Sequence, residues 1–187
     1  LILYAGGTLA LHVERGDRVC QLVTTNGLSQ HYRAIDNYLS GKKVPDIDLL
    51  VEERRQEAIN ASGEVGVTDV RFLGYDDVLD LPDRGLAADI ADVIGDVRPD
   101  IVITHWPYDT VPAHANATQM ALLAISAASG IRNKDHPPHA VKQVFYHTQQ
   151  GYTNVVENLR PHQPTAVIDI TSVVHKKSNA MNRFTSQ

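Results

Sequence analysis

The sequence predicts an α/β protein built as one Rossmann-like domain, with a doubly wound and mostly parallel sheet. Three observations support this fold class. Short apolar runs rich in β-branched residues alternate with segments whose apolar residues recur at helical spacing. The connections between the runs are long enough for the crossover helices that parallel strands require. The chain has 187 residues, of which 43% are hydrophobic, so residues 1–187 can bury one core as a single domain.

Five segments are predicted to be helical. The clearest is Leu86–Val97, whose apolar residues recur on one face and which ends before a proline. In Asp48–Ser62 we expect an amphipathic helix with Val51, Ala58, Ile59 and Ser62 on its apolar face and Glu57 elsewhere. The first helix is expected to begin at Thr8 as its N-cap, after two glycines. The full set is Thr8–Arg15, Asp48–Ser62, Leu86–Val97, Ala115–Ser129 and Ser172–Gln187.

Five apolar runs are predicted to be strands, because each is short and most end at turn-forming or polar residues. Leu28–Asp46 is polar, and we expect a long loop there that serves a ligand site. The predicted strands are Arg18–Thr25, Asp69–Leu73, Asp100–Thr104, Ala140–Tyr146 and Thr165–Ile170. Ligands of doubly wound sheets bind beyond the carboxyl ends of the strands. The residues that follow each strand are therefore the first candidates for a site.

Charge and cysteine content exclude several classes of function. The chain has 17 basic and 22 acidic residues and a pI near 6.0, so it lacks the basic field that binds nucleic acid. A small ligand is expected instead, and no membrane segment is predicted. The single cysteine, Cys20, excludes an intrachain disulfide and a thiolate zinc cage. The cytoplasm is the default location, since no signal peptide is visible.

His105, Asp109 and His114 form the densest cluster of metal-binding residue types, directly after a predicted strand. Pro107 and Pro112 stiffen this loop, which lowers the entropy lost when side chains are held in place. Imidazole and carboxylate are both zinc ligands. The cluster predicts a zinc site, and the alternative is a set of ordinary loop residues with His114 at the start of the next helix.

Two further segments have both a functional and a structural interpretation. Gly6-Gly7-Thr8 is either an anion site at a helix start or a pair of small residues that permits close packing. Neither a dinucleotide fingerprint nor a P-loop is present. Arg54 either binds substrate or pairs with Glu57 three residues later on a solvated helix.

Two more candidates follow predicted strands. Asp76 and Asp77 come after Asp69–Leu73, where carboxylates accept hydrogen bonds from sugar hydroxyls or simply form a turn. His147 comes directly after Ala140–Tyr146, so we predict that it lies in the pocket.

Taken together, these motifs resemble the PIG-L/LmbE-like family of zinc-dependent N-deacetylases. Their order and spacing follow the family over nearly the whole chain. The matching motifs are Ala5-Gly6-Gly7-Thr8, Arg54-Arg55-Gln56-Glu57-Ala58, Phe72-Leu73-Gly74-Tyr75 with Asp77, Thr104-His105 through Asp109 to Pro112 and His114, and Ser186-Gln187. The resemblance implies amide hydrolysis at a zinc ion.

The resemblance also implies a role for each matching residue. In the family, a His-Pro-Asp-Asp segment after the first strand supplies a His and an Asp to zinc, and its other Asp is the general base. His114 corresponds to the third zinc ligand, and Asp109 is expected to be catalytic. Arg54 and Asp77 match positions associated with the sugar hydroxyls. Three protein ligands leave one position for a water whose pKa the metal lowers.

The chain departs from the family pattern at two places. The His-Pro-Asp-Asp segment would fall at or just before Leu1, so we expect the first strand, two zinc ligands and the base upstream of this sequence. A protein without this central parallel strand would expose unpaired strand edges. We therefore expect that the protein has the strand and that this sequence starts after it. Many family members also have His-Pro-Asp-His where this chain has Val111-Pro112-Ala113-His114. The oxyanion role of the first histidine then passes to His147 or is absent.

We therefore expect a zinc-dependent hydrolase that removes an acyl group, acetyl in the first instance, from an amino sugar such as a GlcNAc conjugate. Two alternatives remain open. Val111 and Ala113 favour a non-catalytic sugar-binding domain of the same fold. A nucleotide-binding domain would place phosphate at Gly6-Gly7-Thr8, but the third spaced glycine is absent.

Overall fold

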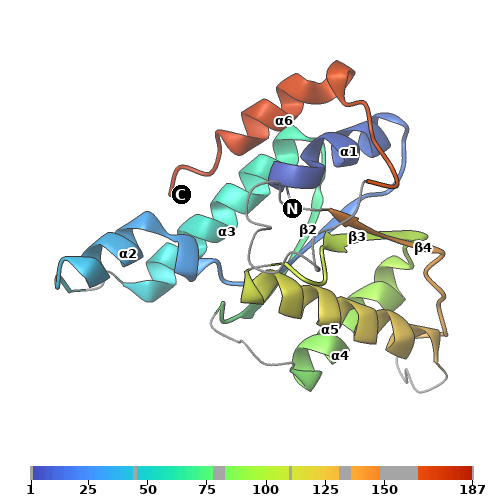
Figure 1. Ribbon diagram of the computed structural model, residues 1–187, viewed down its shortest axis with the longest axis horizontal. Coiled ribbons are helices and arrows are strands. Elements are labelled where there is room, and N and C mark those ends of the chain that lie inside the picture. The colour runs from blue at the N-terminus through green and yellow to red at the C-terminus, as the bar shows by residue number, and fades with distance from the viewer. Residues whose placement is uncertain are drawn as a thin grey trace. The chain divides into compact units, whose positions relative to one another are not determined.

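The computed structural model describes residues 2–43, 46–77, 83–109, 111–130, 136–147 and 164–186. The chain divides into two compact units. The first contains the described residues up to 77 together with 168–186, and the second contains those from 83 to 167. Both units combine helices with parallel strands (Figure 1), which confirms the predicted α/β class. Of the helices that the structure describes, none has the length and apolar character needed to cross a membrane.

The first unit is built on a parallel pair of strands, β1 (Cys20–Thr25) and β2 (Asp69–Tyr75), with Cys20 opposite Asp69. Its α-helices are α1 (Ile2–Glu14), α2 (Tyr32–Leu39), α3 (Ile47–Glu64) and α6 (Val174–Met181), and its single-turn helices are η1 (Leu28–Gln30) and η3 (Thr171–Val173). Helix α6 packs against both α1 and α3 (Figure 1). Apolar side chains between the elements, among them Leu50 and Val65, are fully buried.

The second unit is built on the parallel pair β3 (Ile101–His105) and β4 (Gln143–His147). Helices α4 (Arg84–Val97) and α5 (Pro112–Ser129) pack against each other (Figure 1), and α5 also contacts β3. In the register of the two strands, His105 lies opposite His147. This register brings two histidines together at the carboxyl ends of the strands.

Most predicted elements are confirmed, with shifted ends. Helix α4 begins after the cap Asp83 and ends at Arg98, which adopts a left-handed conformation with φ of 52°. Helix α3 begins after the cap Asp46, whose side chain accepts a hydrogen bond from the backbone N–H of Asp48. Four of the five predicted strands are strands in the structure.

The start of the first helix was predicted wrongly. Helix α1 begins at Ile2, so Thr8 is not an N-cap and Gly6 and Gly7 lie within the helix. A Cβ atom at Gly7 would lie 2.6 Å from the Cδ1 atom of Ile170, so this position requires a glycine for close approach. Close packing at Gly7 is thus confirmed, but against Ile170, which lies in no strand of the described residues, and not against the sheet that the sequence favoured. The anion site is not confirmed, because the backbone N–H groups here belong to a helix interior.

The predicted loop Leu28–Asp46 contains a helix, α2. The local reason is that Tyr32, Ile35 and Leu39 recur at helical spacing within an otherwise polar segment. Their exposed fractions are 52%, 42% and 77%. Residues 32–39 therefore form a helix in which these large apolar side chains remain exposed.

Three other predictions need correction. In α3, Ala58 and Ser62 are buried as expected, but Glu57 is only 6% exposed and Ile59 is 38% exposed, the reverse of the expectation for these two residues. Thr165–Ile170 forms no strand among the described residues, and Val167 is 84% exposed. The last α-helix ends at Met181, and Gln187 lies outside the described residues.

Candidate metal centre and substrate-binding residues

His105, Asp109 and His114 meet in the second unit and form a candidate metal centre. His105 ends β3, His114 lies in the first turn of α5, and Asp109 lies in the loop between them. The three candidate ligand atoms lie within 4.8 Å of one another. In the described part of the chain, this is the one group of three or more His, Cys, Asp or Glu residues that meets this distance. The cluster predicted from the sequence is therefore brought together by the fold.

Asp109 orients His114 through its carboxylate, whose side chain is only 4% exposed. Oδ1 of Asp109 accepts a hydrogen bond of 2.9 Å from the backbone N–H of Val111, and Oδ2 accepts one of 3.1 Å from Nδ1 of His114. A carboxylate on Nδ1 fixes the tautomer of the imidazole. The lone pair of His114 is then on Nε2, which leaves this atom to bind a metal.

His105 lies between two other histidines. Its ring stacks on His114 at a centroid distance of 4.0 Å and contacts His147 edge to face at 4.6 Å. Burial is the main cause that lowers the pKa of His105 to about 2 and that of His147 to about 4, and the electrostatic interaction with His114 lowers both further. Both imidazoles are neutral at neutral pH, which is the state that a metal ligand requires.

The donor set fits a divalent metal. Nδ1 of His105 is buried and, within the described residues, has no hydrogen-bond partner. A buried polar atom without a partner costs free energy unless a ligand satisfies it. Imidazole is a typical ligand of zinc and of related divalent transition metals, and a carboxylate hydrogen-bonded to its second nitrogen is the usual support for such a ligand. The residues present are thus chemically suited to the metal that the sequence predicted.

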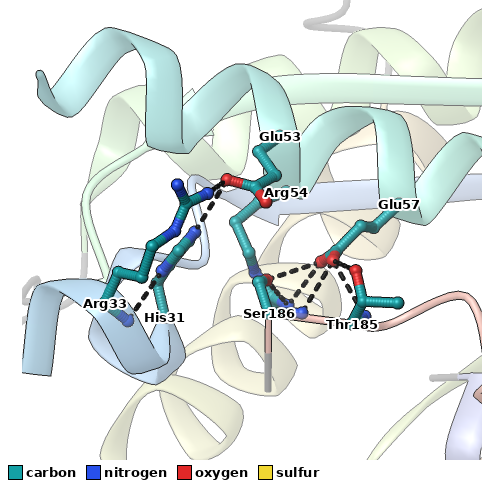
Figure 2. A network of polar contacts seen from close by, with 7 residues as sticks. All are labelled: His31, Arg33, Glu53, Arg54, Glu57, Thr185 and Ser186. Carbon is teal, nitrogen blue, oxygen red and sulfur yellow. Dashed lines mark hydrogen bonds and ion pairs between the residues drawn. The ribbon is translucent and has the colours of Figure 1, made fainter. Parts of the chain in front are cut away.

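Arg54, the first predicted substrate residue, lies in a polar network of the first unit (Figure 2). Its Nη1 donates hydrogen bonds of 3.1 Å to Oε2 of Glu57 and 3.2 Å to Oγ of Ser186. Its side chain is 11% exposed. The predicted pairing with Glu57 is confirmed, but the pair is buried and not on a solvated helix.

Asp77, the second predicted substrate residue, holds the segment that follows β1. Oδ1 accepts a hydrogen bond from the backbone N–H of Gly27, and Oδ2 accepts bonds from the backbone N–H and the hydroxyl of Ser29, at 3.2, 3.0 and 3.0 Å. These contacts join residues 48 and 50 positions apart, so they are not the local turn of the structural interpretation. The sugar-binding role of Asp77 stays a prediction.

Thr185 belongs to the polar network around Glu57 although no sequence pattern pointed to it. Together with Ser186 it donates hydrogen bonds to Glu57, a residue more than one hundred positions earlier. Contacts at this separation leave no local signature in the sequence. The His-Pro-Asp-Asp segment expected before Leu1 lies outside the sequence and stays a prediction.

Comparison with known proteins identifies relatives of the chain. Residues 1–127 match the family described as PIG-L: GlcNAc-PI de-N-acetylase. A probable N-acetyl-alpha-D-glucosaminyl L-malate deacetylase 2 of Bacillus subtilis is 27% identical over 137 residues, which are 72% of this chain and 57% of that protein. A 1D-myo-inositol 2-acetamido-2-deoxy-alpha-D-glucopyranoside deacetylase of Streptomyces griseus is 27% identical over 194 residues, covering 90% of this chain and 59% of that protein. The chain thus spans less than two thirds of these relatives.

Two solved structures share the fold. One is GalB, the 4-carboxy-2-hydroxymuconate hydratase of Pseudomonas putida. Its alignment covers 100% of this chain and 74% of the GalB chain, with a TM-score of 0.79 and 26% sequence identity. The other is the N,N'-diacetylchitobiose deacetylase of Pyrococcus horikoshii. Its alignment covers 100% of this chain and 66% of the deacetylase chain, with a TM-score of 0.79 and 19% sequence identity. The family match extends over more than half of the sequence. This chain therefore belongs to the PIG-L, or GlcNAc-PI de-N-acetylase, family.

Proposed function

We propose that the protein, with residues 1–187 as one functional domain, is a zinc-dependent hydrolase that removes the N-acetyl group of a GlcNAc-containing conjugate. The observation that carries this proposal is the juxtaposition of His105, Asp109 and His114 at the carboxyl end of β3. Membership of the family and the deacetylase names of the Bacillus and Streptomyces relatives support the choice of reaction.

Each residue has a defined part in the proposed site. His114, through Nε2, would hold the metal together with His105 and the ligands expected upstream of Leu1. A bound metal would polarise an amide carbonyl and lower the pKa of a water. Asp109 keeps the His114 imidazole in the tautomer that binds. This is a positioning role, and a direct catalytic role of Asp109 stays a prediction.

The remaining predicted residues bind the substrate. His147, next to His105 in the register of the strands, is proposed to donate a hydrogen bond to the carbonyl oxygen, the role expected of a histidine where this chain has Val111. Arg54 and Asp77 are proposed to bind hydroxyl groups of the sugar, one as a donor and the other as an acceptor.

A second candidate reaction is the hydration of an unsaturated carboxylic acid. It is favoured by one observation, the 26% identity to the hydratase GalB over the whole of this chain. The proposed metal site suits either reaction, because both add water to an electron-poor carbon. The nucleotide-binding alternative is not supported, because Gly6 and Gly7 lie inside α1.

Parallel assays of the purified protein with added zinc distinguish the two reactions. Amine release from N-acetylglucosaminyl conjugates of malate and inositol tests deacetylation, and loss of ultraviolet absorbance of 4-carboxy-2-hydroxymuconate tests hydration. We expect amine release that His114→Ala abolishes and that His12→Ala, a change of a surface histidine paired with Asp17, leaves intact. Hydration without amine release would contradict the deacetylase proposal.

A further inference from the structure

We propose that Glu57 and Ser186 are positioning residues that hold the guanidinium of Arg54 and leave its Nε edge free for a neutral sugar hydroxyl. The inference rests on the proposed function, in which Arg54 binds the sugar. It adds the residues that orient Arg54 and the charge type of the group that Arg54 binds.

Glu57 anchors this arrangement. Its Oε1 accepts hydrogen bonds of 2.9 and 2.9 Å from the backbone N–H and hydroxyl of Thr185, and of 2.8 Å from the backbone N–H of Ser186. Its Oε2 accepts the Ser186 hydroxyl at 2.7 Å and Nη1 of Arg54 at 3.1 Å (Figure 2). A buried carboxylate with this many donors has little freedom to rotate.

Ser186 connects Glu57 to Arg54. Its hydroxyl donates to Oε2 of Glu57 and accepts from Nη1 of Arg54, and the whole residue is 0% exposed. Its carbonyl oxygen accepts a hydrogen bond of 2.9 Å from the backbone N–H of Tyr32. The ring of Phe184 faces the guanidinium carbon of Arg54 at 5.8 Å. Residues 184–186 therefore fix Arg54 on its Nη1 side.

The Nε edge of Arg54 is different. Nε is buried and, among the described residues, has no hydrogen-bond partner. A Cβ atom at Gly27 would lie only 3.1 Å from Nε, so any other residue at this position would crowd this edge of Arg54. The backbone N–H of Gly27 donates to Asp77, which fixes the neighbouring loop. A buried donor that lacks an acceptor indicates a place for a ligand oxygen.

The local charge indicates which kind of oxygen binds there. The positive charge of Arg54 is balanced by Glu57 at 3.1 Å. Asp77 adds a negative charge nearby, and the hydrogen bonds that it accepts from Gly27 and Ser29 come from uncharged groups. A bound carboxylate or phosphate would be repelled by the negative charge of Asp77. The positive charge of Arg54 would not offset this repulsion, because Glu57 already balances it. A neutral hydroxyl can accept from Nε of Arg54 without that repulsion.

The ionised state of Glu57 agrees with this role. Burial alone would raise the pKa of Glu57, but hydrogen bonds from Ser186 and Thr185 and the charge of Arg54 outweigh it and leave the pKa below its ordinary value. Glu57 therefore carries its charge at neutral pH and can hold the guanidinium throughout the working range of the enzyme.

The test compares three variants of the protein labelled with ¹⁵N. Ser186→Ala removes one hydroxyl, Glu57→Gln removes the charge, and Gln56→Ala is a matched control on the same helix that bonds only to Asn60 in the described contacts. The Nε–Hε resonance of Arg54, assigned by its loss in Arg54→Lys, reports the orientation of the guanidinium. We expect it to shift and to exchange faster in Ser186→Ala and Glu57→Gln, and to stay unchanged in the control.

Kinetics with an N-acetylglucosaminyl–inositol conjugate form the second readout. In Ser186→Ala we expect KM to rise about 3- to 10-fold with kcat unchanged, because a binding contact equal in ground state and transition state is weakened. Replacing the neutral sugar with a 6-phosphorylated one should weaken binding to the wild type.

The outcomes separate this inference from the proposed function. An unchanged Arg54 resonance and an unchanged KM in Ser186→Ala would overturn the positioning role, and tighter binding of the phosphorylated sugar would overturn the preference for a neutral group. If the wild type releases no amine but the resonance responds to Ser186→Ala, then the proposed function fails and the positioning role stands.

Discussion

The cluster around Glu57 and the cluster around His105 differ in whether the polar atoms of their central side chain have hydrogen-bond partners. Both oxygens of the buried Glu57 carboxylate accept hydrogen bonds from well-placed donors. Nδ1 of His105 is equally buried but has no hydrogen-bond partner in the described part of the chain. A satisfied network stabilises the fold, whereas an unsatisfied buried nitrogen costs stability and is retained for binding. The difference indicates that the Glu57 carboxylate stabilises the fold, and it supports the proposal that His105 binds a metal.

The two clusters also differ in charge. Hydrogen bonds and Arg54 keep the pKa of Glu57 low and the carboxylate charged, while burial lowers the pKa of His105 to about 2 and keeps the imidazole neutral. The first cluster contains paired charges, and the second presents uncharged lone pairs. Only the second is prepared to receive a cation.

Glu57→Ala should give the largest change in stability. It leaves Arg54 buried without its carboxylate and removes the acceptor of Thr185 and Ser186, so we expect a loss of about 3 to 5 kcal/mol in the free energy of unfolding. Urea denaturation measures this value. Glu52→Ala, an exposed site on the same helix, should change it by less than about 0.5 kcal/mol. A loss as small as that of the control would show that the network does not hold the fold.

Asp109→Asn should weaken metal binding and leave stability nearly unchanged. Loss of the carboxylate on Nδ1 of His114 removes the group that orients the imidazole, and such changes lower metal affinity by about 10- to 100-fold. Competition with a fluorescent zinc chelator measures the affinity. Unchanged affinity would contradict the orienting role of Asp109.

His105→Leu should stabilise the metal-free protein while preventing metal binding. The variant removes a buried nitrogen that lacks a partner, and we expect a gain of about 1 kcal/mol in the free energy of unfolding after chelator treatment. Thermal and urea denaturation measure it. A loss of about 1 kcal/mol instead would show that His105 stabilises the fold, as Glu57 does, and would contradict the difference between the two clusters.

Acid titration of stability should show the smallest effect. The pKa of Glu57 is lowered from its ordinary value of 4.5, so its contribution is present above that pH and is lost as the pH falls through the folded-state pKa. Glu57→Gln should therefore flatten the decline in unfolding free energy between roughly pH 5 and pH 3. An identical slope in the variant and the wild type would show that Glu57 is not held ionised by the fold.

Local patterns predicted the elements that local physics determines. The periodicity of Leu86–Val97 with the proline that follows it, and the apolar run at Asp100–Thr104, were sufficient to predict α4 and β3. Helix α1 was missed at its start because Gly6 and Gly7 usually interrupt a helix, whereas here Gly7 admits the side chain of Ile170. That contact joins residues far apart in sequence and leaves no local trace.

The same distinction applies to the two clusters. His105, Asp109 and His114 were found because they share one short loop. The position of their neighbour His147 was predicted from one rule, that the carboxyl ends of parallel strands lie at the same edge of a sheet. The burial of Glu57 was predicted wrongly, because it depends on donors from Ser186 at the other end of the chain. Helical spacing alone places Glu57 on the polar side.

The central claim, that His105, Asp109 and His114 form a metal site, is tested most directly by elemental analysis of the purified protein. We predict about one zinc per chain in the wild type and in His12→Ala, and its loss in His114→Ala. A wild type that holds no metal even after zinc is added back, or a His114→Ala variant that retains it fully, would contradict the claim.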